Sequence, residues 1–304
     1  MPKKRQKPAI GLVVKRRLEA AEDLAVRVCD FLLKRGYTVL LSEESSSIAK
    51  KLGGHLHDRH LFVVKKTDLP KKAQWILVLG GDGTFISVAR LMGTRSVPLL
   101  GVNMGQLGFL TEVRQEETFS VLETLLRKPS PPYRERALFE VTLRRKGRTI
   151  YSGNIVNDAV IAKGAIARII GLKISIDGQE VHSVRADGVI IATPTGSTAY
   201  SLAAGGPVLE PQLPAMVITP ICPHSLTVRP LVVSDDRHVQ ILLNQSPGEV
   251  FLTLDGQEFV ALKEHDLLEV RRHKKQNLKL IESPKRDYFG LLREKFSFGV
   301  KGTP

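Results

Sequence analysis

The feature that most constrains this chain is the run Gly-Gly-Asp-Gly-Thr at residues 80–84. An apolar run at residues 75–79 precedes it, and residues 85–92 carry apolar side chains at helical spacing after it. Together these segments predict a buried strand, a glycine turn and the start of a helix, with Thr84 as the N-cap. Glycines let a bound anion approach the backbone, and a helix N-terminus favours negative charge. The run therefore predicts a phosphate-binding turn.

Asp82 is the acid within this turn. A carboxylate beside bound phosphates is unfavourable unless it has a role there. It can accept a proton from an attacking hydroxyl group, or it can meet a cation that travels with the phosphates. The alternative is an ordinary strand-to-helix turn, in which the helix dipole favours an acid in the first turn.

Composition indicates a globular protein with room for two domains. The chain has 304 residues, of which 42% are hydrophobic and 25% charged. No apolar run approaches the roughly 18–20 residues of a membrane span, and residues 9–14 are too few for a secretory signal. Cys29 and Cys222 lack metal-ligand spacing. We therefore expect reduced thiols, a cytoplasmic location and no membrane partner.

The net charge of +14 suits polyanionic ligands such as nucleotides or nucleic acid. The basic residues are scattered, and no helix-turn-helix, zinc-finger or RNA-recognition pattern surrounds them. We therefore expect no nucleic-acid partner. His55, His57 and His60 lie in a polar stretch at residues 53–61 that predicts a loop. With no fourth ligand in register, surface histidines are favoured over a zinc site, and we expect no metal held by the protein.

The first half alternates strand and helix patterns. Residues 10–14, 38–41 and 98–102 predict strands, and a helix with an apolar face ends at Gly36. A second glycine-rich segment follows at residues 103–110. This alternation predicts a Rossmann-like α/β domain over residues 1–130, with a mostly parallel sheet covered on both faces. Both glycine segments then lie at the carboxyl edge of the sheet, where ligands bind.

The pattern changes after a linker marked by Pro129, Pro131 and Pro132. Period-two runs follow, two of which end in Asp-Gly turns, and they predict an all-β domain over residues 131–280. The predicted strands are residues 139–143, 172–176, 189–192, 239–243 and 250–254. Residues 288–295 predict a helix in a C-terminal segment, 281–304, that packs back on the first domain.

Two polar stretches stand out in the second half. The Asn157 amide matches the donor and acceptor edge of adenine, and the Asp158 carboxylate suits ribose hydroxyls; the alternative is an Asx turn. Residues 185–207 place a loop dense in glycine and hydroxyl groups after a strand, and predict a second helix N-terminus. Tyr200 there has a ring that can stack on a base. The alternative is a capped helix with Tyr200 in the core.

Five motifs in one order resemble the NAD kinases. They are residues 80–84, residues 101–110, Asn157-Asp158, residues 187–200 with Thr-Pro-Thr-Gly-Ser-Thr-Ala-Tyr at 193–200, and Asp255-Gly256-Gln257. They span most of the chain. The first motif is shared with diacylglycerol and sphingosine kinases and, more loosely, with phosphofructokinases, whereas residues 193–200 are much more specific.

The resemblance implies transfer of the ATP γ-phosphoryl group to the 2′-hydroxyl of the adenosine ribose of NAD, with Asp82 as general base. Asn157 would contact adenine and Asp158 the ribose; the family usually has Asn-Glu, so the shorter Asp158 departs from the pattern. Arg185 and Asp187 would lie at the nicotinamide end. The other implied nucleotide-binding residues are Gly81, Gly83, Thr84, Asn103, Lys163, Arg168, Thr195, Thr198, Ala199, Tyr200, Ser201 and Gln257.

The resemblance also implies partners. These are NAD, ATP or polyphosphate as substrates, Mg²⁺ or another divalent cation carried with ATP, and a homodimer or homotetramer. Two alternatives remain open from the residues alone: a lipid kinase that shares the glycine turn, and a non-catalytic dinucleotide-binding regulator.

Overall fold

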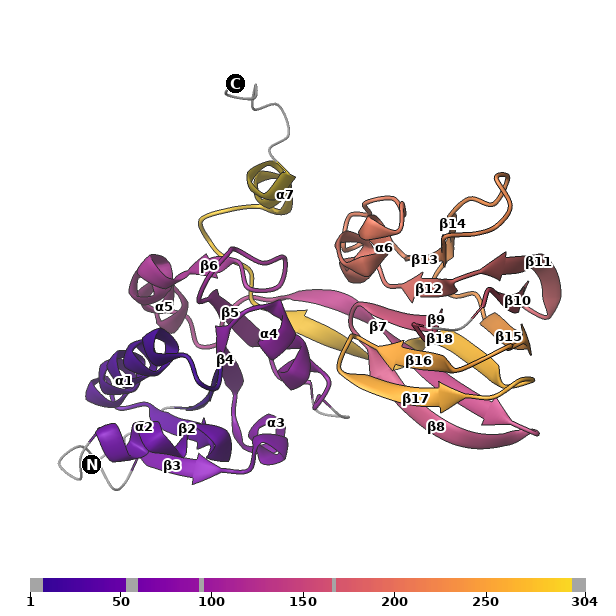
Figure 1. The fold of residues 1–304 in the computed structure, drawn as a ribbon. Coiled ribbons are helices and arrows are strands. Elements are labelled where there is room, and N and C mark those ends of the chain that lie inside the picture. The colour runs from indigo at the N-terminus through magenta and orange to yellow at the C-terminus, as the bar shows by residue number, and fades with distance from the viewer. Residues whose placement is uncertain (1–7, 53–59, 93–95, 166–167, 297–304) are drawn as a thin grey trace. The chain divides into compact units, whose positions relative to one another are not determined.

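The chain folds into two units. The computed structural model describes residues 8–52, 60–92, 96–165 and 168–296. One unit combines Met1–Glu135 with Leu278–Pro304, and the other comprises Arg136–Asn277. The first is an α/β domain and the second is all-β, so the predicted fold class is confirmed (Figure 1).

The sheet of the first unit is parallel, with the strand order β3-β2-β1-β4-β5 and β6 paired with β5. The strand order reverses where β1 pairs with β4, and in such sheets ligands bind at this reversal, outside the carboxyl ends of the strands. The glycine turn lies at the carboxyl end of β4, and it is therefore located at this reversal. The strands are β1 (Ala9–Val14), β2 (Thr38–Ser42), β3 (Leu61–Val64), β4 (Trp75–Gly80), β5 (Leu99–Asn103) and β6 (Val113–Arg114).

Both faces of this sheet are covered, as the unbroken apolar strands predict. Leu77 and Leu79 of β4 face one core and Ile76 and Val78 the opposite side, and all four are buried. On the first face α1 packs beside α5, with the rings of Phe31 and Phe119 5.3 Å apart. The helices of this unit are α1 (Glu19–Lys34), α2 (Ser46–Lys51), α3 (Leu69–Lys72), α4 (Asp82–Ala89), α5 (Thr118–Leu126) and α7 (Tyr288–Phe296), with 3₁₀ turns at Glu43–Ser45, Lys66–Asp68 and Gln115–Glu117.

One detail of this unit differs from the sequence-based expectation. Most of the loop predicted over residues 53–61 lies outside the described residues, and Leu61 begins the edge strand β3. This strand has four residues of partial or full exposure, so it lacks the apolar pattern of a buried strand. His60 contacts Thr38, its Nδ1 lying 3.4 Å from Oγ1, whereas His55 and His57 fall outside the described residues.

The second unit consists of two sheets that enclose one core. One sheet has the order β11-β10-β15-β18 with β7 and β8 added through β18, and the other has the order β14-β13-β12-β9-β16-β17. The first sheet contains β7 (Arg134–Arg145), β8 (Arg148–Ile155), β10 (Ile170–Ile176), β11 (Gln179–Ala186), β15 (Val239–Gln245) and β18 (Leu267–Leu280). The second contains β9 (Asp158–Lys163), β12 (Gly188–Ala192), β13 (Ala215–Ile221), β14 (Leu231–Ser234), β16 (Val250–Leu254) and β17 (Glu258–Leu262).

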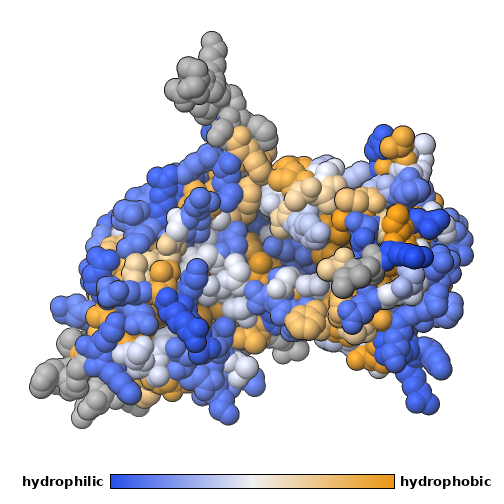
Figure 2. Space-filling view, viewed as in Figure 1, coloured by the Kyte–Doolittle hydropathy of each residue, from blue (hydrophilic) through white to orange (hydrophobic). Residues whose placement is uncertain are grey.

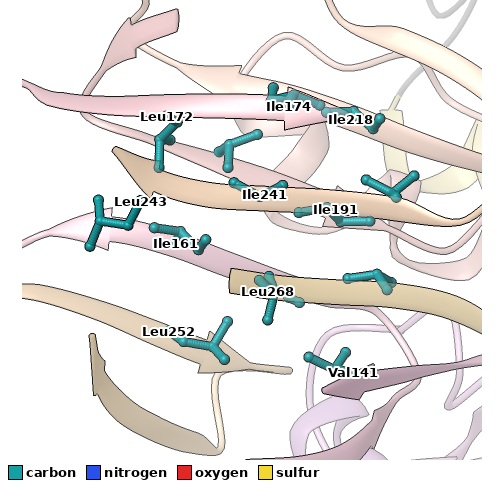
Figure 3. Close-up of a cluster of buried hydrophobic side chains, with 14 of the residues drawn as sticks. Val141, Ile161, Leu172, Ile174, Ile191, Ile218, Ile241, Leu243, Leu252 and Leu268 are labelled. Carbon is teal, nitrogen blue, oxygen red and sulfur yellow. The ribbon is translucent and has the colours of Figure 1, made fainter. Parts of the chain in front are cut away.

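Aliphatic side chains from both sheets form this core (Figure 3). Leu172 and Ile241 come from one sheet and Ile161 and Ile191 from the other, and all are buried. The predicted Asp-Gly turns close two hairpins. At β10–β11 both turn residues have positive φ, 51° and 82°, which the short polar side chain and the glycine tolerate.

The C-terminal helix α7 packs on the first unit, as predicted. The Arg286 guanidinium donates to both carboxylate oxygens of Glu117, at 2.7 and 2.9 Å, and to the Glu112 carbonyl. Arg114 also pairs with Glu294 on α7. Burial raises the pKa of the Glu117 carboxyl, but the hydrogen bonds from Arg286 and the Arg114 amide outweigh it and hold that pKa below its usual value.

Two further features concern the surface and the thiols. Hydrophilic residues cover much of the visible surface of the α/β unit (Figure 2). Cys29 and Cys222 are both free, and burial raises the pKa of the Cys29 thiol to about 12. Within the described ranges, no helix is both long and apolar enough to cross a membrane.

A glycine in the central strand β12 provides a test of this fold. A Cβ atom at Gly188 would lie 2.2 Å from the Ile161 carbonyl oxygen on the paired strand β9, where the backbone cannot move aside. We expect Gly188→Ala to destabilise the protein by about 3 kcal/mol, at the upper end of overpacking effects. At Gly164 the nearest atom to such a Cβ is 3.4 Å away, so Gly164→Ala is the control. Equal thermal midpoints for the two variants would contradict this packing.

Candidate functional site

Helix α4 begins three residues earlier than the sequence predicts. Gly81 is the N-cap residue and Asp82 the first helical residue, so Thr84 lies inside the first turn rather than at the N-cap. The Thr84 side chain instead lies against Gly80, where an added Cβ would be 2.7 Å from Oγ1. Gly81 and Gly83 have open space where a side chain would stand. Their backbone is therefore accessible to an anion at the helix N-terminus.

The Asp82 carboxylate is held by three consecutive residues at the end of the second glycine segment and just after it. Its Oδ1 accepts hydrogen bonds from the backbone amides of Leu110 and Thr111, at 3.2 and 3.0 Å, and from Thr111 Oγ1 at 2.8 Å. Its Oδ2 accepts one from the Phe109 amide at 2.9 Å. Oδ1 is thus saturated, whereas Oδ2 keeps a lone pair for a further donor.

Asn103 and Gly108 complete this arrangement. Asn103, at the end of β5, donates from Nδ2 to Thr111 Oγ1 at 2.9 Å and accepts from the Gly105 amide at 2.6 Å. The chain of donors from Asn103 through Thr111 to Asp82 fixes the orientation of the Thr111 hydroxyl. A Cβ at Gly108 would lie 1.9 Å from Asp82 Oδ1, so this close approach requires glycine. Thus both glycine segments meet at one carboxylate.

The second unit contains a comparable arrangement around Asp255. This carboxylate accepts hydrogen bonds from the consecutive amides of Val156, Asn157 and Asp158, and its own amide donates to the Asp158 carbonyl. Asp255 has a φ of 52° in the turn after β16. The backbone of Asn157 and Asp158 is therefore held by a carboxylate that is distant in sequence. The pair does not form an Asx turn, in which its own side chain would accept the hydrogen bond.

The loop after β12 holds the same pair from its other side. Thr193 Oγ1 donates to the Val156 carbonyl at 2.6 Å, and the Thr193 amide donates to the Asn157 carbonyl at 2.8 Å. A Cβ at Gly196 would lie 2.1 Å from that Asn157 carbonyl oxygen, so the two segments touch through their backbones. The structure thus brings the motifs at residues 157–158, 193–200 and 255–257 together.

Asp158 is the electrostatically unusual member of this group. Its side chain is buried at the start of β9, close to the Asp255 carboxylate. Burial, and then repulsion from Asp255, raise the pKa of Asp158 to about 7. The charge of Asp158 therefore changes near neutral pH. The protonated carboxyl can donate a hydrogen bond to a ligand hydroxyl group, whereas the carboxylate can only accept one.

Residues 195–203 form a short 3₁₀ turn, Thr195–Thr198, and a four-residue helix, α6 (Tyr200–Ala203), where the sequence predicts a helix N-terminus. Tyr200 is 47% exposed, which rules out the alternative that it lies in the core. Thr195 Oγ1 is buried and has no hydrogen-bond partner among the described residues, a state that a ligand would relieve. The Ser201 hydroxyl is buried against Thr219 Oγ1 at 2.8 Å. Thr198 Oγ1 donates to the Thr195 carbonyl.

Arg185 and Asp187, expected at the nicotinamide end, and three further predicted nucleotide-binding residues lie near strand ends of the second unit. Lys163 Nζ pairs with Asp187 Oδ1 at 3.1 Å, and the Lys163 amide donates to the Asp187 carbonyl. Arg185 is exposed on β11, and Arg168 is exposed before β10. Gln257 is exposed in the β16–β17 turn.

Each half of the chain matches a model of the same protein family. Residues 10–129 match the family model described as the ATP-NAD kinase N-terminal domain, and residues 156–283 match the one described as the ATP-NAD kinase C-terminal domain. The chain belongs to the NAD kinase family. It is 46% identical to an NAD kinase of Geotalea daltonii over 91% of this chain and 94% of that protein. It is 45% identical to one of Aquifex aeolicus over 80% and 87%.

Solved structures of NAD kinases share the fold. Yeast NADH kinase complexed with NADH superposes with a TM-score of 0.89 at 27% identity, over 99% of this chain and 90% of that one. An NAD kinase from Archaeoglobus fulgidus in complex with ATP gives 0.67 at 22% identity, over 95% and 96%, which shows the fold alone. The predicted membership of the NAD kinases is confirmed.

Sequence reasoning missed the residues that hold this candidate site in place. Thr111 follows the second glycine segment directly, and a hydroxyl at that position is a signal that could have been used. Asp255 belongs to a recognised motif but was not assigned a role, since the amides it binds are about a hundred residues away in sequence. Phe109 donates through its backbone amide, and such a donor cannot be recognised from the type of its side chain.

The raised pKa of Asp158 gives a testable stability effect. Between pH 4 and 7 the folded chain keeps a proton that the unfolded chain releases, so the stability of the folded state falls across that window and is level above it. Asp158→Asn removes this effect. We expect the thermal midpoint of this variant to exceed that of the wild type by more at pH 8 than at pH 5. The corresponding gain in the free energy of unfolding is at most roughly 4 kcal/mol.

Calorimetry at the two pH values provides the check. Asp236→Asn is the matched control, because its side chain is 77% exposed in the same unit, and its midpoint should equal the wild-type value at both pH values. A gain for Asp158→Asn that does not change with pH would contradict the raised pKa.

Proposed function

We propose that this chain transfers the γ-phosphoryl group of ATP to the 2′-hydroxyl of the adenosine ribose of NAD, giving NADP, with Asp82 as the general base. Membership of the NAD kinase family supports this activity over a lipid kinase or a non-catalytic regulator. The single observation that carries the residue assignment is the Asp82 carboxylate, fixed beside a glycine turn with one oxygen saturated and the other open.

The proposed base chemistry follows from that geometry. A ribose hydroxyl is a poor nucleophile at neutral pH, and a positioned carboxylate can take its proton as the new bond to phosphorus forms. Asp82 Oδ2 takes the proton, the ribose oxygen bonds to the γ-phosphorus, and the bond from that phosphorus to the β-γ bridging oxygen breaks to release ADP. The proton then passes to solvent.

The glycine turn contributes the electrostatic part. Amides at the N-terminus of α4, with Gly81 and Gly83 leaving open space, would neutralise charge on the transferring phosphoryl group. Thr84 would contribute from the same first turn. An ATP-using kinase works with a divalent cation, and we propose Mg²⁺ or a similar ion bound to the ATP phosphates and delivered with them.

The second unit supplies the proposed recognition of NAD. The Asn157 side chain would read adenine, because Asp255 and Thr193 fix its backbone. Asp158 would contact the ribose, and the unpartnered Thr195 hydroxyl would bond to the nucleotide. Half-exposed Tyr200 would stack on a ring. Thr198, Ala199, Ser201 and Gln257 would line the same site, Lys163, Arg168, Arg185 and Asp187 would meet the nicotinamide end, and Asn103 would support the phosphate end.

Location, assembly and donor complete the proposal. We propose a cytoplasmic homodimer or homotetramer without nucleic-acid or membrane partners. Light scattering on the purified protein distinguishes the two assemblies. An assay that crosses ATP and polyphosphate with NAD and NADH would define the donor and the acceptor.

Replacing the base tests the assignment directly. Asp82→Asn keeps the shape of the side chain but cannot accept the hydroxyl proton. We expect kcat to fall by about 10²–10⁴ while NAD still binds. Labelled ATP measures turnover, and calorimetric titration measures NAD binding. Near-native turnover in this variant would remove Asp82 from the role.

Thr111→Val tests the support of that base. Valine keeps the volume but removes the donor to Asp82 Oδ1 and the acceptor for Asn103 Nδ2. A hydrogen bond to a charged group is worth about 1.5–3 kcal/mol, so kcat should fall roughly 10- to 100-fold with KM for NAD little changed. Thr124→Val is the control, since its hydroxyl bonds to the Ser120 carbonyl on an exposed helix face. Equal kcat in both variants would show that the Thr111 hydroxyl is dispensable.

A further inference from the structure

Helix α7 contacts the loop that holds Asp82, and this contact has no part in the chemistry described so far. Lys295 Nζ donates to the Leu107 carbonyl at 2.5 Å and lies 5.1 Å from the centre of the Phe109 ring. The same ring packs against Phe296 at 5.8 Å and Tyr288 at 6.4 Å between centroids. Both the first and last turns of α7 therefore touch the residue whose amide binds Asp82 Oδ2.

The loop needs such contacts because its own structure is weak. Residues 104–112 contain neither helix nor strand, and Gly105 and Gly108 lie among them. Glycine-containing segments without regular hydrogen bonding have many alternative conformations of similar energy. The alignment of three consecutive amides on one carboxylate requires that one conformation dominates. Contacts to the Phe109 ring and the Leu107 carbonyl favour it.

Helix α7 is itself firmly attached. Arg286, just before it, binds both oxygens of Glu117 with both partners mostly shielded from solvent. The Ser283 amide donates to the buried Glu112 carboxylate at 3.1 Å. These contacts connect α7 to the segment that directly follows the loop, so the loop is fixed between two anchored points.

We propose that α7 is a positioning element for the catalytic base, acting through Lys295 and the aromatic contact of Tyr288 and Phe296 with Phe109. The inference rests on the proposed function for its kinetic consequence, since it names what holds Asp82 in a productive geometry. Lys295 contacts Leu107 and Phe109, and Phe296 contacts Phe109. They act on the backbone of residues 107–111.

The test compares two cations on the same helix. Arg293 and Lys295 both lie in the last turn of α7, and Arg293 has no hydrogen bond or ion pair to another described residue. Lys295→Ala should lower kcat by about 2- to 10-fold, the range expected for loss of an exposed cation–π contact and one hydrogen bond, with KM values unchanged. Arg293→Ala should leave kcat at the wild-type value. Lys295→Arg, which keeps a donor and a cation over the ring, should restore it.

A double-mutant cycle separates positioning from general destabilisation. In the Asp82→Asn background there is no base to position, so adding Lys295→Ala should leave the residual turnover unchanged. The same fold-loss in both backgrounds would overturn the proposal. So would a lowered kcat in Arg293→Ala equal to that of Lys295→Ala.

Hydrogen exchange provides a readout that does not depend on activity. In the substrate-free protein, the amides of Phe109, Leu110 and Thr111 should exchange faster in Lys295→Ala and Phe296→Ala than in the wild type, and Arg293→Ala should match the wild type. Unchanged exchange in both variants would overturn the proposal even if NAD turnover is present. If exchange rises as expected while the wild type never phosphorylates NAD, the positioning role stands and the proposed function fails.

Discussion

The carboxylate of Asp82, held by three consecutive backbone amides and one hydroxyl, is the interaction on which the first unit depends. It joins two glycine segments that follow neighbouring parallel strands, and the close approach at Gly108 shows why no side chain fits between them. The same bonds that order the loop also fix the acid. A single residue therefore organises the local structure and carries the proposed chemistry, and substitutions of the loop affect both.

The second unit uses the same device for a different purpose. Asp255 accepts hydrogen bonds from the amides of three consecutive residues, and these include the pair Asn157-Asp158, whose side chains we propose recognise the nucleotide. In each unit an acid distant in sequence fixes an irregular backbone segment that the strands alone leave undefined. The two arrangements differ in the groups that remain for a ligand. In the first unit this is one carboxylate oxygen of Asp82, and in the second it is the Asn157 side-chain amide with the adjacent buried carboxyl of Asp158. Burial, and then repulsion from the nearby Asp255 carboxylate, raise the pKa of Asp158.

Much of the fold could be predicted because the relevant signals are local. The apolar runs before the glycine turn, the apolar face of α1 and the Asp-Gly turns each specify one element within a short window. The edge strand β3 was missed because its exposed residues lack periodicity, and the N-cap was misplaced because glycine satisfies that position without a side-chain signal. In the candidate site, the motifs themselves could be recognised because their residues are contiguous, while the roles of their side chains stay predictions. The roles of Thr111, Asp255 and the amide donors were missed, since they arise from contacts between segments far apart in the chain.

The first unit is discontinuous, because Leu278 and the residues after it complete a domain that the chain begins before Glu135. During synthesis the ribosome must produce the whole β-rich unit before α7 can reach its place. Until then the nascent α/β segment exposes the surface that α7 later covers, and the loop around Asp82 lacks its outer contacts. The order of translation thus makes competence a late event, reached only after α7 itself has been synthesised.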